Sequence, residues 1–236
     1  ADNVTIDGNG YTITYGLSAS SYSYGIFITN NSQEAKIQNL ILEQGNNRGN
    51  YKYGIFLNNT INNTIGNNTI TTNGIYSYGV YAYQNSNFNL IENNTITSTN
   101  TSAYGIYVQQ SDNNTIDSNT IISSGTRGYG IYLYQDTGGN TIQDNTINSN
   151  GSYGYGIYLD TNASSNTIST NAIDTQNTYG YGIYLYTNTT LNTIDSNTIT
   201  TNNTYGYGIL LQTGANSNTI TNNNATAYGG TGYALY

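Results

Sequence analysis

Few side chains in this sequence could do acid–base or metal chemistry. The 236 residues include no His and no Cys, and 12 Asp and Glu residues stand against 4 Lys and Arg residues. Glu92 and Asp117 follow Ile91 and Ile116 at equivalent places 25 residues apart. Two adjacent carboxylates could bind Ca²⁺ or share a proton, but solvated surface acids are the simpler interpretation, because perturbed groups need burial and partners. We predict no catalytic residue, no cofactor and at most a weak metal site at this pair.

Aromatic side chains are the more unusual feature, with 27 Tyr residues in the chain. A tyrosine before a regularly spaced glycine, as in Tyr129-Gly130, is expected to face the core or a corner. A second column is expected to form an exposed aromatic ladder, made of Tyr81, Tyr107, Tyr132, Tyr158 and Tyr184, with Tyr83, Tyr134 and Tyr186 beside it in some repeats. Ring stacking alone, at ~0.5–1 kcal/mol per pair, would account for such columns. An exposed stripe this long would equally suit a neighbouring rod or sugar rings.

These side chains are positioned by an internal repeat. Its marker glycines are Gly25, Gly54, Gly79, Gly105, Gly130, Gly156, Gly182 and Gly208, with Ala234 in the ninth place. After a first gap of 29 residues, every spacing is 25 or 26 residues. A period of this length is typical of solenoids and repeat arrays. We therefore expect a single domain over residues 1–236, with divergent first coils at 1–52 and regular coils at 53–236.

Each repeat contains three short strand patterns. In residues 182–185 the alternation places Ile183 and Leu185 on one face and Tyr184 on the other. Two Asn-Thr-Ile triplets follow, at 192–194 and 197–199, and their Ile residues should point inward. Strands stacked ~4.8 Å apart then predict an all-β, right-handed parallel β-solenoid of about nine coils, about 26 residues each, with Ile columns inside and an Asn ladder at one corner.

The amino-acid composition argues against several classes of function. A formal charge of −8 with dispersed basic residues argues against nucleic-acid binding, which needs clustered Lys or Arg. No apolar run approaches the ~20 residues of a membrane span, so we expect no membrane insertion. A mature start at Ala1-Asp2 would suit a secreted, extracellular or cell-surface protein. Exposed sequons could then carry glycans, and candidates are Asn62, Asn93, Asn113, Asn188 and Asn202.

The repeat resembles a known family. Residues 181–185, followed by the triplets at 192–194 and 197–199 and opened by residues 3–11, look like the right-handed parallel β-helix repeats of the periplasmic copper-processing NosD proteins. More broadly, they are similar to the carbohydrate-binding and sugar-hydrolase β-helix group. The resemblance covers essentially the whole chain. It consists of core and corner positions, so it implies the fold more strongly than any activity.

The same resemblance suggests what an enzyme of this kind would need. Polygalacturonase-like members use clustered Asp residues with a His, and pectate-lyase-like members use acidic Ca²⁺ ligands with an Arg or Lys base. This sequence has no His, and Arg127 has no carboxylate at the matching position of the next coil. We therefore predict that the chain is not an enzyme.

The ends suggest how the rod could assemble. No amphipathic helix, Pro or Lys-rich edge caps either end, as a solenoid ordinarily requires. The chain begins in the second strand of a coil and stops in the first, so head-to-tail stacking would continue the coil through Val4, Ile6, Ala234, Leu235 and Tyr236. An excised piece of a longer protein explains the same ends equally well.

Three functions follow from these features. The main hypothesis is a secreted structural solenoid, its partner a further copy of itself, that stacks head to tail into an extracellular or cell-surface filament. The alternative is a carbohydrate-binding or carbohydrate-processing β-helix with glycans as ligands. Ice binding is a weaker third, because Thr-x-Thr faces such as 69–71, 95–97 and 198–200 are interrupted by Ile122, Asn148 and Asp174.

Overall fold

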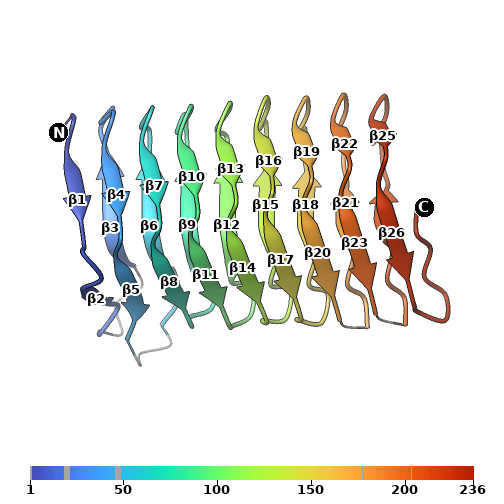
Figure 1. Ribbon diagram of the computed structural model, residues 1–236, viewed down its shortest axis with the longest axis horizontal. Coiled ribbons are helices and arrows are strands. Elements are labelled where there is room, and N and C mark those ends of the chain that lie inside the picture. The colour runs from blue at the N-terminus through green and yellow to red at the C-terminus, as the bar shows by residue number, and fades with distance from the viewer. Residues whose placement is uncertain (1, 19–21, 46–48, 177, 203) are drawn as a thin grey trace.

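Three parallel sheets wind around one core in the computed structural model, which describes residues 2–18, 22–45, 49–176, 178–202 and 204–236. The coils stack side by side along the long axis, with the two ends of the chain at opposite ends of the rod (Figure 1). In the described ranges there is no helix, and consequently none long and apolar enough to cross a membrane. The prediction of an all-β parallel solenoid with three short strands per coil is confirmed.

Successive coils contribute one strand to each sheet, with nine strands in sheets A and B and eight in sheet C among the described residues. Sheet A contains β1 (Thr5–Asp7), β4 (Lys36–Gln38), β7 (Thr64–Gly66), β10 (Leu90–Glu92), β13 (Thr115–Asp117), β16 (Thr141–Gln143), β19 (Thr167–Ser169), β22 (Thr193–Asp195) and β25 (Thr219–Thr221). Sheet B contains β2 (Thr12–Tyr15), β5 (Ile41–Gln44), β8 (Thr69–Thr72), β11 (Thr95–Ser98), β14 (Thr120–Ser123), β17 (Thr146–Ser149), β20 (Ala172–Thr175), β23 (Thr198–Thr201) and β26 (Asn224–Ala227). Sheet C contains β3 (Ser23–Thr29), β6 (Lys52–Asn58), β9 (Tyr78–Tyr83), β12 (Tyr104–Gln109), β15 (Ile131–Tyr134), β18 (Ile157–Asp160), β21 (Ile183–Leu185) and β24 (Ile209–Leu211).

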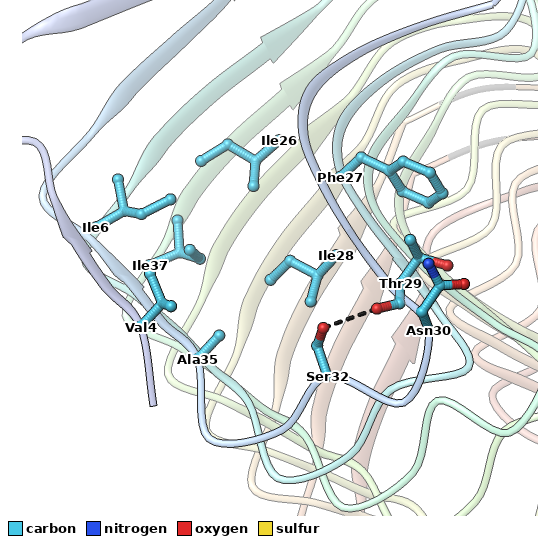
Figure 2. Close-up of a pocket in the computed structure, with 10 residues that line it drawn as sticks. All are labelled: Val4, Ile6, Ile26, Phe27, Ile28, Thr29, Asn30, Ser32, Ala35 and Ile37. Carbon is cyan, nitrogen blue, oxygen red and sulfur yellow. Dashed lines mark hydrogen bonds between the residues drawn. The ribbon is translucent and has the colours of Figure 1, made fainter. Parts of the chain in front are cut away.

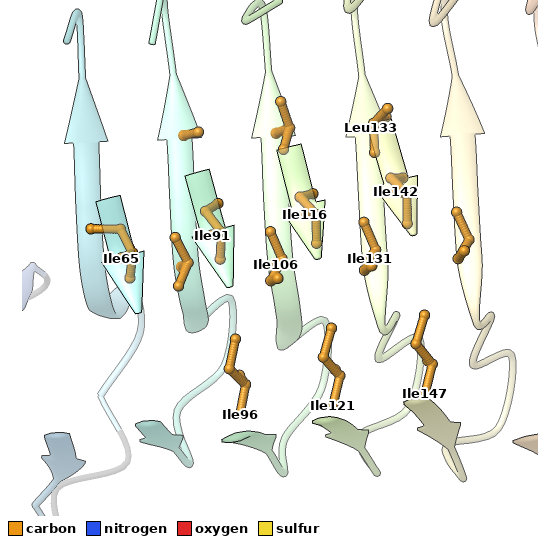
Figure 3. Packing of buried hydrophobic residues seen from close by; sticks show 14 of the residues in the cluster. Ile65, Ile91, Ile96, Ile106, Ile116, Ile121, Ile131, Leu133, Ile142 and Ile147 are labelled. Carbon is orange, nitrogen blue, oxygen red and sulfur yellow. The ribbon is translucent and has the colours of Figure 1, made fainter. Parts of the chain in front are cut away.

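The strands pair in register, so equivalent residues stack directly. Ile116 pairs with Ile91 on one side and Ile142 on the other. Figure 3 shows the inward side chains of all three sheets meeting in columns, among them Ile116, Ile121 and Ile106. These three are fully buried, so the repeat fills the core with one set of apolar side chains per coil.

Two buried asparagine ladders flank sheet A. The expected one, through Asn114 and Asn140, joins the coils by side-chain bonds such as Asn114 Nδ2 to Asn140 Oδ1 at 3.1 Å. A second, which the sequence analysis missed, runs from Asn68 to Asn223 through Asn119 and Asn145, where Asn119 Nδ2 donates to Asn145 Oδ1 at 3.0 Å. Each amide also bonds backbone atoms, so these buried polar groups are satisfied.

The marker glycine breaks the strand alternation. A Cβ on Gly130 would overlap Ile147 Cγ2 and lie 2.6 Å from the carbonyl oxygen of Gly156, so only glycine allows this close approach. The inward position is thereby occupied by Gly130, and Tyr129 packs with the outer rings rather than the core. Of the two places expected for the tyrosines before the glycines, the core or a corner, the core is therefore excluded, because strict alternation does not continue through the glycine.

The solenoid core is open at both ends. Figure 2 shows the first coils, where inward side chains such as Val4, Ile6 and Ile26 line a hollow of about 320 Å³. A hollow of about 250 Å³ at the other end is lined by residues that include Ile209, Ala225 and Leu235. Of the predicted end residues, Val4 is 37% exposed and Tyr236 is 60% exposed. These hollows are uncovered core, and assembly through them stays a prediction.

Candidate functional site

The outer face of sheet C carries two packed columns of aromatic rings. The pre-glycine column holds Tyr78, Tyr104, Tyr129, Tyr155 and Tyr181, and the mid-strand column holds Tyr81, Tyr107, Tyr132, Tyr158 and Tyr184. Rings stack from coil to coil within each column, with centroids 4.9 Å apart for Tyr104 and Tyr129 and 4.8 Å for Tyr132 and Tyr158. Between columns the rings meet edge to face, as Tyr104 and Tyr107 do at 5.5 Å and 77°. The parallel register thus builds a continuous double ladder.

The mid-strand column is not the exposed ladder that the sequence predicted. Tyr107 is 7% exposed, and Tyr81, Tyr158 and Tyr184 are each 8% exposed, while Tyr132 is half-buried. The pre-glycine rings turn outward beside them and cover their flanks, which alternation alone could not foresee. The residues lie on the predicted face, but their rings are mostly hidden from solvent.

Burial makes these tyrosines weaker acids than a tyrosine in water. It raises the pKa of Tyr104 to about 12 and raises the pKa of Tyr107 further above its usual value. For Tyr132 and Tyr158, burial is again the main cause of the raised pKa, and the nearby Asp160 carboxylate adds to it. Their hydroxyls therefore remain protonated hydrogen-bond donors at neutral pH.

A third column at the strand ends is more accessible. This strand-end column holds Tyr83, Gln109, Tyr134, Asp160, Tyr186 and Gln212 in successive coils. In-register pairing places Gln109 between Tyr83 and Tyr134, and Tyr134 next to Asp160. Tyr83, Tyr134 and Tyr186 are half-buried, and Gln212 is exposed. Aromatic and polar side chains thus alternate coil by coil from Tyr83 to Gln212.

Hydroxyls of the mid-strand column donate hydrogen bonds to the polar members of the strand-end column. Tyr81 donates to Gln109 Oε1 and Tyr184 donates to Gln212 Oε1, each at 2.7 Å. Asp160 Oδ2 accepts from Tyr158 at 3.1 Å and from Tyr132 at 3.4 Å. The hydrogen bonds hold one amide or carboxylate in place in every second coil.

The sequence reasoning noted Tyr83, Tyr134 and Tyr186 but missed the alternation. Its signal is a spacing of 51 and then 52 residues, or two repeats, between successive tyrosines of this column. The polar members follow the same spacing, from Gln109 to Asp160 to Gln212. A search for one repeat length alone does not reveal a feature that recurs every second coil.

A further exposed column lies on the loops that lead from sheet B into sheet C. Tyr153 and Tyr179 stack at 4.8 Å, and Tyr179 and Tyr205 at 4.9 Å. Tyr153 is 44% exposed and Tyr205 is 41% exposed. Arg127, one coil before Tyr153, takes the equivalent place and interrupts this corner column.

The acidic pair lies side by side, and a metal site there stays a prediction. Glu92 and Asp117 pair in register on the outer face of sheet A, as expected, and both are half-buried. Among the described residues, no group of three or more His, Cys, Asp or Glu side chains could hold a metal ion. The pKa of Asp195 is lowered by hydrogen bonds from Thr221, Asn222 and Ser196, so this carboxylate is occupied by its neighbours.

The remaining surface predictions fall on exposed positions. The side chains of Asn62, Asn93, Asn113, Asn188 and Asn202 are all exposed. Their use as glycosylation sites stays a prediction. On sheet B, the first Thr of strands such as β8, β11 and β23 is exposed, but a hollow of about 370 Å³ opens around Ala172 and Asp174. Ice binding also stays a prediction, on a face that is less flat than a continuous Thr array would be.

Comparisons with known proteins agree on the architecture. The family model described as right handed beta helix region matches residues 2–173 and 89–236, in agreement with the predicted handedness. A structure of the periplasmic alginate epimerase AlgG aligns with a TM-score of 0.57 at 14% identity, covering 82% of this chain and 49% of that chain. A double mutant of AlgG gives 0.57 at 18% identity, covering 89% and 56%. This chain therefore spans about half the length of these structures. None of the curated proteins matches the sequence.

These similarities correct one prediction. The sequence analysis predicted that the chain is not an enzyme, because it lacks His and a cluster of acids. That prediction is wrong, since solved structures that share its fold include those of an epimerase, which is an enzyme. The missing side chains rule out particular mechanisms and do not rule out catalysis on this scaffold.

Proposed function

The chain belongs to the right-handed β-helix family, and from that premise we propose that it is a carbohydrate-binding or carbohydrate-processing protein. Its polysaccharide ligand would lie along the outer face of sheet C. This was the alternative hypothesis from the sequence, and the similarity to an alginate epimerase favours it over a structural filament. The periplasmic location of that epimerase fits a protein that works outside the cytoplasm.

One observation carries the proposal, namely the accessible tyrosines of the strand-end column. Among the described residues, the ring contact that Tyr134 makes is with Tyr132 of its own coil, at 5.5 Å. Its neighbours in the column are Gln109 and Asp160, so no ring of its own column covers its faces. Half-buried aromatic rings beside hydrogen-bonding groups suit the apolar faces and hydroxyls of sugars.

The double ladder behind this column supports it as a rigid base. Rings packed on both sides fix the mid-strand tyrosines, and their hydroxyls fix Gln109, Asp160 and Gln212. A ligand would therefore meet groups that are already oriented, which lowers the entropy lost on binding.

The proposal is tested by affinity electrophoresis on a panel of soluble polysaccharides, with reducing-end and unsaturated-product assays on the same samples. Replacing Tyr83, Tyr134 and Tyr186 together by Ala should raise Kd about tenfold or more, as expected for lost aromatic anchors. The matched control replaces Thr95, Thr120 and Thr146, outward residues of sheet B, by Ala. The proposal would be overturned if both variants were retained as strongly as the unmodified chain. It would also be overturned if no polysaccharide retained the protein.

Head-to-tail association is a second proposal, which rests on the open apolar core at both ends. Ile6 is 38% exposed at one end and Leu235 is 55% exposed at the other, so a second copy could cover both. Negative-stain microscopy and sedimentation across a range of concentrations test it. Filaments that grow with concentration would support it, and dispersed short rods at every concentration would contradict it.

A further inference from the structure

From β9 onward the strand-end column repeats every second coil, although the fold repeats every coil; the two in-register residues before it, Thr29 and Asn58, are both polar. Tyrosines occupy it at positions 83, 134 and 186, and polar residues occupy it at 109, 160 and 212. With strands ~4.8 Å apart, successive tyrosines lie roughly 9.6 Å apart along the axis. The core and both asparagine ladders repeat every coil, so the packing of the core does not require this doubled period.

We infer that the ligand is a neutral, ribbon-shaped polysaccharide that lies parallel to the solenoid axis, with its two-sugar repeat in register with two coils. The inference rests on the proposed function and specifies the substrate class. In a β-1,4-linked chain each sugar is rotated by about half a turn relative to the last, so every second sugar presents the same face. A ligand of this shape would place one equivalent sugar face on each strand-end tyrosine.

The polar members of the column fit the sugars in between. Gln109 lies between Tyr83 and Tyr134, and it also donates from Nε2 to Gln135 Oε1 at 3.2 Å. Asp160 lies next to Tyr134 and accepts two tyrosine hydroxyls on one oxygen. An acceptor held between two aromatic positions can take a hydrogen bond from a hydroxyl of the intervening sugar.

The charges favour a neutral ligand. From β9 onward, Asp160 is the one charged residue in the strand-end column, and Asp136 follows β15 in the adjoining loop. Arg127, exposed at the border of the face, is the one cation in the chain after Lys52. With a formal net charge of −8, the chain would repel a polyuronate that carries a carboxylate on every sugar.

A length series tests the register. Isothermal titration would use neutral β-1,4-linked oligosaccharides of two to eight sugars, an α-linked glucan and oligouronates at 0.15 M salt. We expect Kd to fall by roughly fivefold for each added pair of sugars, with little change for the odd sugar between, because each pair reaches one more tyrosine. The α-linked glucan and the oligouronates should bind at least about tenfold more weakly.

A swap variant separates spacing from aromatic content. Exchanging the two residues, Gln109→Tyr with Tyr134→Gln, keeps the composition but places tyrosines one and then three coils apart. It should weaken binding as much as Tyr134→Ala, whereas Tyr153→Ala in the corner column should not. Thermal unfolding of each variant checks that the solenoid remains folded.

Each result bears on one level of the hypothesis. A swap variant that binds as tightly as the unmodified chain, or affinity that rises evenly with every sugar, would overturn the two-coil register. Binding of oligouronates in preference to neutral chains would overturn the neutral class and leave the proposed function intact. Failure of every carbohydrate to bind would overturn both.

Discussion

The outer faces of sheets B and C differ, although their strands come from the same coils and cover the same core. On sheet B the outward residues are short and vary from coil to coil, as Thr97, Ile122 and Asn148 show at one equivalent position. On sheet C two columns are almost invariantly aromatic, and a third alternates between tyrosine and a polar residue. Packing constrains the inner positions of both sheets alike, so the regularity of sheet C needs a reason outside the core.

The stability of the fold explains part of the regularity of sheet C. Stacked and edge-to-face rings such as Tyr104, Tyr107 and Tyr129 shield sheet C from water, and each pair contributes about 0.5–1.5 kcal/mol beyond its buried area. Thr is simply a good outward strand residue on sheet B. Ring stacking does not explain the strand-end column, because its alternation adds no stacked neighbour within the column. The comparison therefore separates a stabilising ladder from an accessible column beside it.

The largest effect should come from alkaline pH, which acts on sheet C. An unfolded tyrosine has a pKa of about 10, whereas burial raises the pKa of Tyr104 to about 12 and that of Tyr107 higher still. The folded state therefore resists deprotonation, and the stability from these groups is fully present below pH 10 and is lost as pH rises from about 10 through 12. We expect cooperative unfolding in that window, followed by circular dichroism together with tyrosinate absorbance.

The control for this prediction is Tyr107→Phe, which removes a titrating hydroxyl but keeps the ring. It should move the alkaline midpoint upward, because one fewer buried group has to ionise. Gradual tyrosinate absorbance from pH 10, with no accompanying unfolding, would show that the ladder is open to solvent.

The second-largest effect should come from replacing the marker glycine, which turns the pre-glycine ring outward on sheet C and has no counterpart on sheet B. Gly130→Ala would drive a methyl group into Ile147 and against the Gly156 carbonyl, so we expect a loss of about 3 kcal/mol in the free energy of unfolding. Gly66→Ala is the matched control on sheet A, where the added Cβ would meet Glu92 at an ordinary 3.6 Å. Denaturant titration measures both, and equal midpoints would mean that the backbone can shift at Gly130.

The corner between sheets A and B should be less costly to break. Asn145→Ala removes an acceptor for Asn119 and donors to Asn171 and the Ile116 carbonyl, which leaves buried groups unpaired. We expect a loss of about 2 kcal/mol. Asn148→Ala, on the outward face of sheet B three residues later, should cost less than about 0.5 kcal/mol. A similar midpoint shift for both variants would show that the ladder carries no special stability.

Much of the fold followed from the sequence because one period controls it. Ile116 and Asn114 recur with that period, and their column and ladder lie where predicted. The orientation of Tyr129 did not follow, since it depends on a close backbone approach at Gly130 that no alternation rule contains. The prediction that Tyr107 is exposed was wrong for the same reason, because a neighbouring ring covers it. The alternation of Gln109 and Tyr134 was readable but needed a search at twice the period.

The smallest effect should come from repairing the Thr column of sheet B. Ala172 pairs with Thr146 and Thr198 in register, and its exposed side chain leaves part of the hollow between them. Ala172→Thr should raise the free energy of unfolding by about 0.5 kcal/mol, because a β-branched residue suits an outward strand position and meets no buried atom. Polysaccharide affinity should stay unchanged, since the substitution lies on another face from the strand-end tyrosines. Paired denaturant and binding titrations measure both quantities, and a change in affinity would place sheet B within the ligand site and remove the contrast between the two faces.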